Sequence, residues 1–325
     1  MHIIVTGSIA TDYLMVFPGT FTEQLVSDKL DSLSLSFLVD DLAIHRGGAG
    51  ANIAFNLGCL GLRPVLVGAV GTDFAEYGAW LSEHGVDISG VHVSELKHTA
   101  RFLCTTDANQ NQIASFYAGA MTESRNIELA PTVDRIGGTD LVLIGPNDPM
   151  AMRRHTRECR RRGYPFAADP SQQLASLDGD QIRELVAGAA YLFTNEYERG
   201  LLERKTGWDD EDILARVDVS VMTRGAKGVT VQRRGESAIS VTPPQELVKA
   251  DPTGVGDAFR AGFLAGVAWG VSAERAAQLG CMLATLVIES VGTQEHELVR
   301  STFLARFTEA YGPDSAAEVA HHLPA

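Results

Sequence analysis

Short apolar runs alternate along the chain with segments in which apolar residues recur at helical spacing. A short apolar run bounded by turn residues predicts a buried strand, and a period of about 3.6 residues predicts an amphipathic helix. The expected strands are residues 3–6, 65–69, 141–144, 166–168, 191–194 and 219–223. The expected helices lie near residues 50–61, 73–84, 149–162, 179–187, 196–205 and 209–216. This alternation predicts an α/β protein whose mostly parallel sheet is covered by helices on both faces.

Two segments break the alternation and predict a small second sheet. Residues 13–46 contain apolar stretches at 34–39 and 42–45. Residues 99–117 have the pattern of a hairpin around the polar turn at 107–112. We expect these two segments to form a lid over the large domain. The large domain then consists of residues 1–12, 47–98 and 118–325.

The turn at residues 251–257 places the carboxylate of Asp257 at the start of an apolar helix that runs to about Trp269. Gly254 and Gly256 allow the backbone N–H groups to point at a common centre, and the helix N-terminus adds partial positive charge. The turn therefore predicts an anion site. A carboxylate does not favour an anion, so Asp257 is explained if it takes a proton from a hydroxyl that attacks a phosphate. A simple helix cap is the alternative interpretation of Asp257.

A second glycine-rich segment, residues 45–58, is a Gly-Gly turn that leads into a helix of small residues. Together, in this order and about 200 residues apart, the two segments resemble the paired signatures of the ribokinase family of sugar and nucleoside kinases. This family is also called the phosphofructokinase-B family, and the resemblance covers nearly the whole chain. Pro252 stands where the family usually has Thr, and Val255 where it usually has Ala. Neither change removes a catalytic group.

The resemblance implies a ribokinase-like three-layer αβα sandwich with a β-sheet lid, which forms the dimer contact in several members. It is strongest to the bacterial adenosine kinases of the family. The matching segments are residues 7–12, 34–41, 98–102, 169–173 and 289–294. The resemblance thus implies transfer of the γ-phosphate of ATP to the 5′-hydroxyl of adenosine, giving AMP and ADP. A sugar kinase of the same family and a catalytically silent nucleoside-binding regulator stay open as alternatives.

The resemblance also implies a role for each matching position. Asp257 is the expected catalytic base, and backbone N–H groups around Gly254, Val255 and Gly256 would stabilise the transferring phosphoryl group. The residues expected to bind the nucleoside are Ser8, Asp12, Ser36, Gly48, Asn52, Phe102, Phe116, Gln172, Gln173 and Asp257.

The expected nucleotide site follows two other strands. The residues expected to bind ATP are Asn195, Thr223, Gly225, Gly228 and Gly256. The resemblance further implies that Glu198, in an Asn-x-x-Glu motif, organises Mg²⁺ partly through water, which suits a cation that keeps most of its waters. Finally, the resemblance implies a K⁺ site near Asp251, Thr253 and Gly292.

Two aromatic residues of the predicted hairpin bear on the choice of substrate. Period-two alternation places Phe102 on the same face as Cys104, and Phe116 on the same face as Ala114. If the strand register turns both rings to the ligand, they would flank a flat heterocycle, and stacking is worth roughly 1–3 kcal/mol per base. A free sugar has no such need. In the alternative interpretation, both rings fill the core of the lid.

Composition and charge narrow the classes of partner. A formal net charge of −14 argues against nucleic acid, because phosphate backbones would be repelled. The basic run at residues 153–162 falls on an expected helix and is typical of a solvated face. Four scattered cysteines predict neither a disulfide framework nor a zinc site, and fit a cytoplasmic protein. We expect no signal peptide and, since Glu274 and Arg275 interrupt the apolar residues 261–291, no membrane span.

Overall fold

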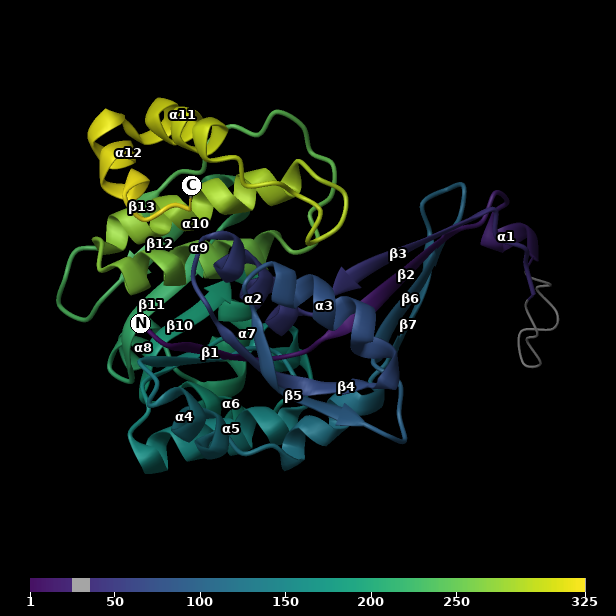
Figure 1. Cartoon of the computed structure of the whole chain (residues 1–325), viewed down its shortest axis with the longest axis horizontal. Helices are drawn as coiled ribbons and strands as arrows, with labels where there is room; N and C mark the ends of the chain where they lie inside the picture. Colours follow the sequence, from purple (N-terminus) through teal and green to yellow (C-terminus); the bar gives the residue numbers. More distant parts are fainter. Residues whose placement is uncertain (25–35, 325) are drawn as a thin grey trace.

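The computed structural model of the chain describes residues 1–24 and 36–324. It consists of a large α/β domain and a four-stranded sheet that projects from one side (Figure 1). The large sheet has nine strands in the order β13-β12-β11-β10-β9-β8-β1-β4-β5, and all neighbours from β11 to β5 are parallel. The strands are β1 (Ile3–Thr6), β4 (Val65–Gly71), β5 (Asp87–Ser94), β8 (Leu141–Ile144), β9 (Phe166–Ala168), β10 (Ala189–Asn195), β11 (Val217–Thr223), β12 (Val229–Gln232) and β13 (Ile239–Val241).

Helices pack on both faces of this sheet because successive strand residues point to opposite sides. In β1, Ile3 and Val5 belong to one buried core and Ile4 to the other. The first core is covered by α2 (Ala49–Cys59), α3 (Ala75–Glu83), α9 (Val255–Trp269), α10 (Ala273–Ile288), α11 (Arg300–Tyr311) and α12 (Pro313–Ala320). The second is covered by α4 (Ala130–Ile136), α5 (Pro149–Arg162), α6 (Gly179–Val186), α7 (Glu196–Thr206) and α8 (Asp210–Leu214). The three-layer fold predicted from the sequence is confirmed.

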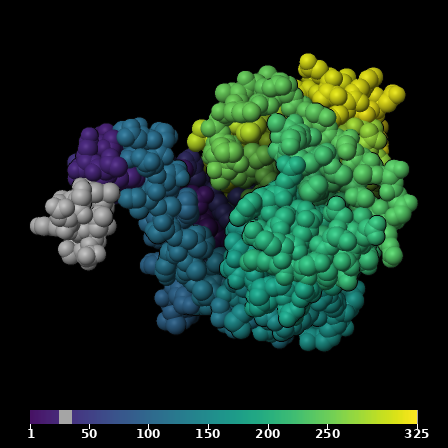
Figure 2. Space-filling model, turned by 180° about the vertical axis from the view of Figure 1, so that it is seen from behind, coloured from purple at the N-terminus to yellow at the C-terminus, as the bar shows by residue number. Residues whose placement is uncertain are grey.

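The small sheet, called the lid below, has the strand order β3-β2-β6-β7. Its strands are β2 (Ala10–Val16), β3 (Asp41–Gly47), β6 (Ala100–Thr106) and β7 (Gln112–Tyr117), and the short helix α1 (Phe21–Gln24) follows β2. Asp12 pairs with Phe102, and Phe102 pairs with Phe116. Directly paired residues share a face, so these three side chains lie on one side of the lid. The space-filling view shows the lid standing out from the large domain (Figure 2).

The strand expected at residues 34–39 is not seen. Residues 34 and 35 lie outside the described part of the chain, and residues 36–39 have no regular structure. The ring of Phe37 packs against those of Phe17 and Phe21, with centroids 4.9 and 5.4 Å apart. This aromatic cluster holds the segment near α1, at the end of the lid remote from the large domain (Figure 1).

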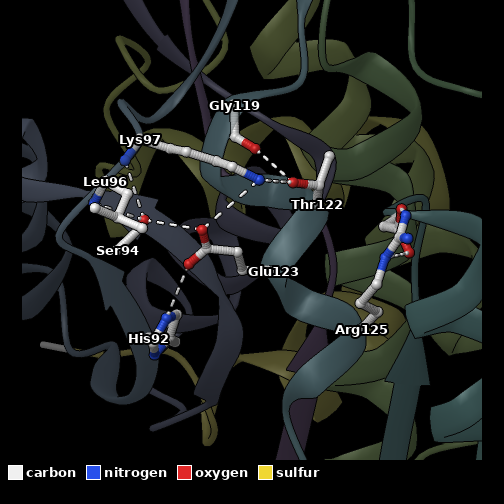
Figure 3. A network of polar contacts seen from close by, with 9 residues as sticks. His92, Ser94, Leu96, Lys97, Gly119, Thr122, Glu123 and Arg125 are labelled. Carbon is white, nitrogen blue, oxygen red and sulfur yellow. Dashed lines mark hydrogen bonds and ion pairs between the residues drawn. The ribbon is translucent and has the colours of Figure 1, made fainter.

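A polar cluster around Glu123 fixes the base of the lid (Figure 3). The Glu123 carboxylate accepts a hydrogen bond from Ser94 Oγ at 3.0 Å and lies 3.1 Å from His92 Nε2. Lys97 Nζ lies 3.7 Å from the same carboxylate. His92 and Ser94 end β5 just before the chain enters β6, and Glu123 follows β7. The cluster therefore joins the two connections between the hairpin and the large domain.

Strands β5, β12 and β13 were not predicted. β5 and β13 are the two edge strands of the large sheet, where one side of a strand has no neighbour, and exposed positions interrupt their apolar runs. β12 lies between β11 and β13, but it is only four residues long and alternates buried and half-buried positions. An edge strand therefore lacks the continuous apolar signal of a central strand. None of the described helices combines the length and apolar character needed to cross a bilayer.

Candidate active site

Two cavities lie on either side of the turn at the start of α9. Gly254 and Asp257 line a cavity of ≈ 480 Å³ that extends to the lid. Val255 and Gly256 line a second cavity, of ≈ 350 Å³, between α10 and the end of β11. Both lie beyond the carboxyl ends of parallel strands, where ligands bind in open α/β sheets. One turn therefore presents its first and last residues to one cavity and its two middle residues to the other.

The turn owes its shape to its two glycines. Gly254 has φ 76°, in the left-handed region, and a Cβ there would lie 2.9 Å from the Thr293 side chain. A Cβ at Gly256 would lie 2.9 Å from Arg260 Nη1. Gly254 is the residue that begins α9, and no side chain caps this helix. The alternative interpretation of Asp257 as a helix cap is therefore wrong. The Val255 N–H makes a long hydrogen bond of 3.5 Å to the carbonyl oxygen of Pro252, and the next N–H groups of α9 are left for a ligand.

Asp257 is held by a hydrogen bond from the second glycine-rich segment. Asn52 Nδ2, on α2, donates to Asp257 Oδ2 at 2.9 Å. Asn52 Oδ1 in turn accepts from Thr293 Oγ1 at 2.8 Å and from Gln294 Nε2 at 2.9 Å. The amino group of Gln294 can only donate, so Asn52 turns its oxygen toward Gln294 and its own amino group toward Asp257. Thr293 and Gln294 were missed as site residues, although residues 289–294 belong to a matching segment.

Burial raises the pKa of Asp257 to about 6. The hydrogen bond from Asn52 and the charge of Arg260 act in the opposite direction, whereas Glu198 and Asp12 raise the pKa further. Burial, together with the charge of Asp251, also raises the pKa of Asp12 to about 6. Asp257 is thus mostly ionised at neutral pH and has an affinity for protons that suits a general base.

The cavity beside the lid gathers most of the side chains predicted to bind a nucleoside. Phe116 is 53% exposed, so its ring does not fill a core inside the lid. Asn147, which follows β8, also lines this cavity, and its Nδ2 is buried without a hydrogen-bond partner. The predicted residues that line this cavity are Ser8, Asp12, Gly48, Asn52, Phe102, Phe116, Gln172, Gln173 and Asp257.

Among the residues predicted to bind a nucleoside, Ser36 does not line this cavity. Its side chain is exposed. The neighbouring Phe37 packs with Phe17 and Phe21, which draws this part of the chain to the remote end of the lid. A sequence match cannot reveal this displacement, because it depends on aromatic contacts within the lid. Within a single chain, Ser36 is therefore removed from the predicted pocket.

The second cavity gathers the residues predicted to bind ATP. The predicted residues that line it are Asn195, Thr223, Gly225, Gly228 and Gly256. Gly228 has φ 90°, and a Cβ there would lie 1.9 Å from the carbonyl oxygen of Val241, so only glycine fits. Lys249 and the prolines at 243 and 244 complete the wall and were not predicted. Their segment carries no strand or helix pattern that would have marked it.

Few protein groups are placed to hold a metal ion. No group of three or more His, Cys, Asp or Glu suited to a metal occurs in the described residues. Glu198 forms a capping box with Asn195, and its Oε1 lies 3.3 Å from Ser171 Oγ. Asp169 Oδ1 is buried without a hydrogen-bond partner. Two carboxylates beside a phosphate site fit Mg²⁺, which uses one or two carboxylates and takes its other ligands from water and phosphate.

Comparison with known proteins gives one family. The sequence profile of the pfkB family carbohydrate kinases matches residues 13–299. The nucleoside kinase of Methanocaldococcus jannaschii is 28% identical over 272 residues, which is 82% of this chain and 87% of that protein. The structure of Burkholderia thailandensis nucleoside kinase with inosine has a TM-score of 0.83 at 33% identity, covering 96% of this chain and 98% of the other. Its complex described as ADP-inosine has a TM-score of 0.81 at 34% identity, covering 96% of both chains.

The buried carboxylate predicts a pH-dependent cost in stability. We expect Asp257→Asn to increase the free energy of unfolding at pH 7.5 by about 1–2 kcal/mol, discounted for partial exposure. The folded-state pKa of about 6 lies above the ordinary value of 3.8, so stability falls as the pH rises between them. Asn carries no charge to desolvate, and its oxygen still accepts from Asn52. Urea unfolding from pH 3.5 to 8 should show this gain growing up to about pH 6.

The matched control is Asp178→Asn at the start of α6. Asp178 caps its helix by accepting from the Gln181 N–H, and Asn caps a helix about as well as Asp. This variant should differ from the parent by less than about 0.5 kcal/mol over the same pH range. A destabilised Asp257→Asn protein with no pH dependence would contradict burial as the cause.

Proposed function

We propose that this chain, which belongs to the pfkB family of carbohydrate kinases, transfers the γ-phosphate of ATP to the 5′-hydroxyl of a nucleoside. The observation that carries the proposal is the single turn, residues 254–257, between two cavities. Gly254 and the Asp257 carboxylate line the cavity beside the lid, and Val255 and Gly256 line the other. This arrangement suits a hydroxyl on one side and a triphosphate on the other.

In the proposed reaction, Asp257 accepts the proton of the 5′-hydroxyl while that oxygen attacks the γ-phosphorus in line. Asn52 holds the carboxylate in place, and N–H groups at the start of α9 stabilise charge on the transferring phosphoryl group. Mg²⁺, when bound, neutralises charge on the β- and γ-phosphate oxygens. Glu198 and Asp169 would hold it, partly through water. Asp12 would accept hydrogen bonds from the ribose hydroxyls.

A nucleoside suits the lid cavity better than a free sugar does. Phe102 and Phe116 are directly paired, and both line the cavity, so two ring faces are available to a base. Gln172 and Gln173 line the same cavity, and an amide can both donate to and accept from a base edge. The nucleoside kinases among the relatives point the same way. We take adenosine, and hence purine salvage in the cytoplasm, as the specific form of the proposal because the matching segments are those of adenosine kinases.

The deciding experiment is a coupled ADP-release assay with adenosine, inosine, guanosine, ribose and fructose, each with and without Mg²⁺ and K⁺. We expect the highest kcat/KM for adenosine, dependence on Mg²⁺, and stimulation by K⁺. Asp257→Asn should lower kcat about 10²–10⁴-fold, the usual loss when a general base is removed. Preference for ribose or fructose would favour the sugar kinase. Binding of a nucleoside without turnover would favour the silent regulator.

The lid aromatics predict a difference between substrates. Phe102→Ala and Phe116→Ala should each weaken adenosine binding by roughly 1–3 kcal/mol, because each removes one stacking surface for the base. Ribose turnover, where it can be measured, should not change. Phe17→Ala is the control, since Phe17 belongs to the aromatic cluster near α1 and does not line the cavity. It should lower the melting temperature and leave adenosine affinity intact in calorimetry. Equal losses with adenosine and ribose would rule out base stacking.

We further propose that the chain forms a homodimer through the outer face of the lid. Leu42, Ile44, Ile113 and Tyr117 are exposed, and strand alternation places them on the face opposite Asp12. An exposed apolar patch of this kind is typical of an interface.

Ile44→Glu should shift the protein from dimer to monomer in sedimentation velocity, because it places a charge in the middle of the apolar face. Met150→Glu, an equally exposed apolar position on α5, should leave the assembly unchanged. A monomeric parent protein would remove this proposal.

A further inference from the structure

Arg260 is a buried cation directly behind the catalytic turn. It lies one turn along α9 from Gly256 and is 5% exposed. In the described part of the chain, Arg199 is the other basic residue of comparable burial, and it hydrogen-bonds to Ser220 on β11. A buried guanidinium needs partners of opposite charge or it costs several kcal/mol. The partners of Arg260 therefore indicate its role.

Its contacts join the turn to two strands. Arg260 Nε lies 2.6 Å from Asp169 Oδ2, just beyond β9, and Nη2 lies 3.9 Å from Glu198 Oε2, just beyond β10. Nη1 donates to the carbonyl oxygen of Gly256 at 3.0 Å. The guanidinium approaches Gly256 so closely that a side chain there would collide with it. The place of the guanidinium therefore depends on the absence of a side chain at Gly256.

Asp257 is otherwise surrounded by negative and neutral groups. Asp12 on β2 and Glu198 on α7 both raise the pKa of Asp257, as its own burial does, and Arg260 lowers it. From the other packed elements, Asn52 on α2 donates a hydrogen bond, and Tyr77 on α3 is a buried neutral phenol. Asp169 adds a further carboxylate. Arg260 is therefore the buried positive charge that balances this set.

We propose that Arg260 is a positioning residue for phosphoryl transfer: it fastens the turn at 254–257 to the ends of β9 and β10 and supplies the positive charge that keeps Asp257 ionised. This rests on the proposed function of Asp257 as the base. Arg260 lines neither cavity, so it acts through Asp257 and the turn rather than on a substrate.

The test compares Arg260→Gln, Arg260→Lys and Arg199→Gln by the pH dependence of kcat/KM from pH 5 to 9.5. Loss of an opposite charge near Asp raises its pKa by about 1–3 units. In Arg260→Gln the acid limb should therefore move up by about 1–2 pH units, and activity lost at pH 7 should return by pH 9. Arg260→Lys keeps the charge and should stay within about half a unit of the parent. Arg199→Gln should lose stability without moving the limb.

Two results would overturn the proposal. An acid limb at its parent position in Arg260→Gln, with activity lost equally at every pH, would make Arg260 a purely structural residue. Nucleoside affinity falling as much as kcat would show that Arg260 shapes the binding cavity instead. Arg260→Lys provides a second test, because it keeps the charge at the buried site but cannot reproduce all three guanidinium contacts. An acid limb in Arg260→Lys that moves as far as in Arg260→Gln, at native stability, also counts against the charge role.

A double-mutant cycle separates this inference from the proposed function. Unfolding of Arg260→Gln, Asp257→Asn and the double variant in urea needs no substrate. We expect the two changes to be coupled about tenfold in the unfolding equilibrium at pH 8, and uncoupled at pH 4, where Asp257 is neutral. If the two changes are coupled but the protein phosphorylates no nucleoside, the interaction between Arg260 and Asp257 stands and only the proposed reaction is contradicted. Absent coupling at pH 8 would remove the interaction itself.

Discussion

The hydrogen bond from Asn52 to Asp257 joins the two glycine-rich segments on which the site depends. It links α2 to α9 across about 200 residues of sequence. The Thr293 hydroxyl lies 2.8 Å both from Asn52 Oδ1 and from the carbonyl oxygen of Arg46 in the lid, and its single proton is available to either. Asp257, the floor of the cavity beside the lid and the root of the lid therefore share one polar network. Such a network specifies a single geometry only when every member is satisfied, as Asn52 is here.

Close backbone packing makes this bond possible. Gly50 lies so near Gly7 that a Cβ on either would be 2.7 Å from the other's backbone, which allows α2 to begin directly over the end of β1. Gly262 meets Gly280 in the same way where α9 crosses α10. A single added methyl group at these contacts would displace a helix, and overpacking of this kind costs about 1–3 kcal/mol. The helix that carries Asp257 is thus placed by glycines outside the turn as well as within it.

The central strands and the turn at 254–257 could be predicted because their signals are local. A buried parallel strand is a continuous apolar run, and the glycines flanking Asp257 are adjacent in sequence. The edge strand β5 has no such run, so it was missed. Ser36 was misplaced because the packing of Phe37 against Phe17 and Phe21 decides where that segment goes. The role of Arg260 was not predicted because its carboxylate partners are distant in sequence. Only the fold brings them to it, from the ends of two strands.

Local groups at the site explain how a chain with a net charge of −14 can accept a triphosphate. Its overall field repels ATP, so attraction has to come from groups within a few ångströms, where screening by water and salt is weakest. The N–H groups at the start of α9 are such groups. They are fixed in the folded chain before any ligand arrives, and Arg260, which lines neither cavity, holds the turn that presents them. Their arrangement costs stability, because Asp257 and Asp169 are held ionisable in a buried place that raises the pKa of each. In the proposed role of Asp257 as base, the burial that lowers stability is the same burial that raises its pKa and hence its affinity for a proton.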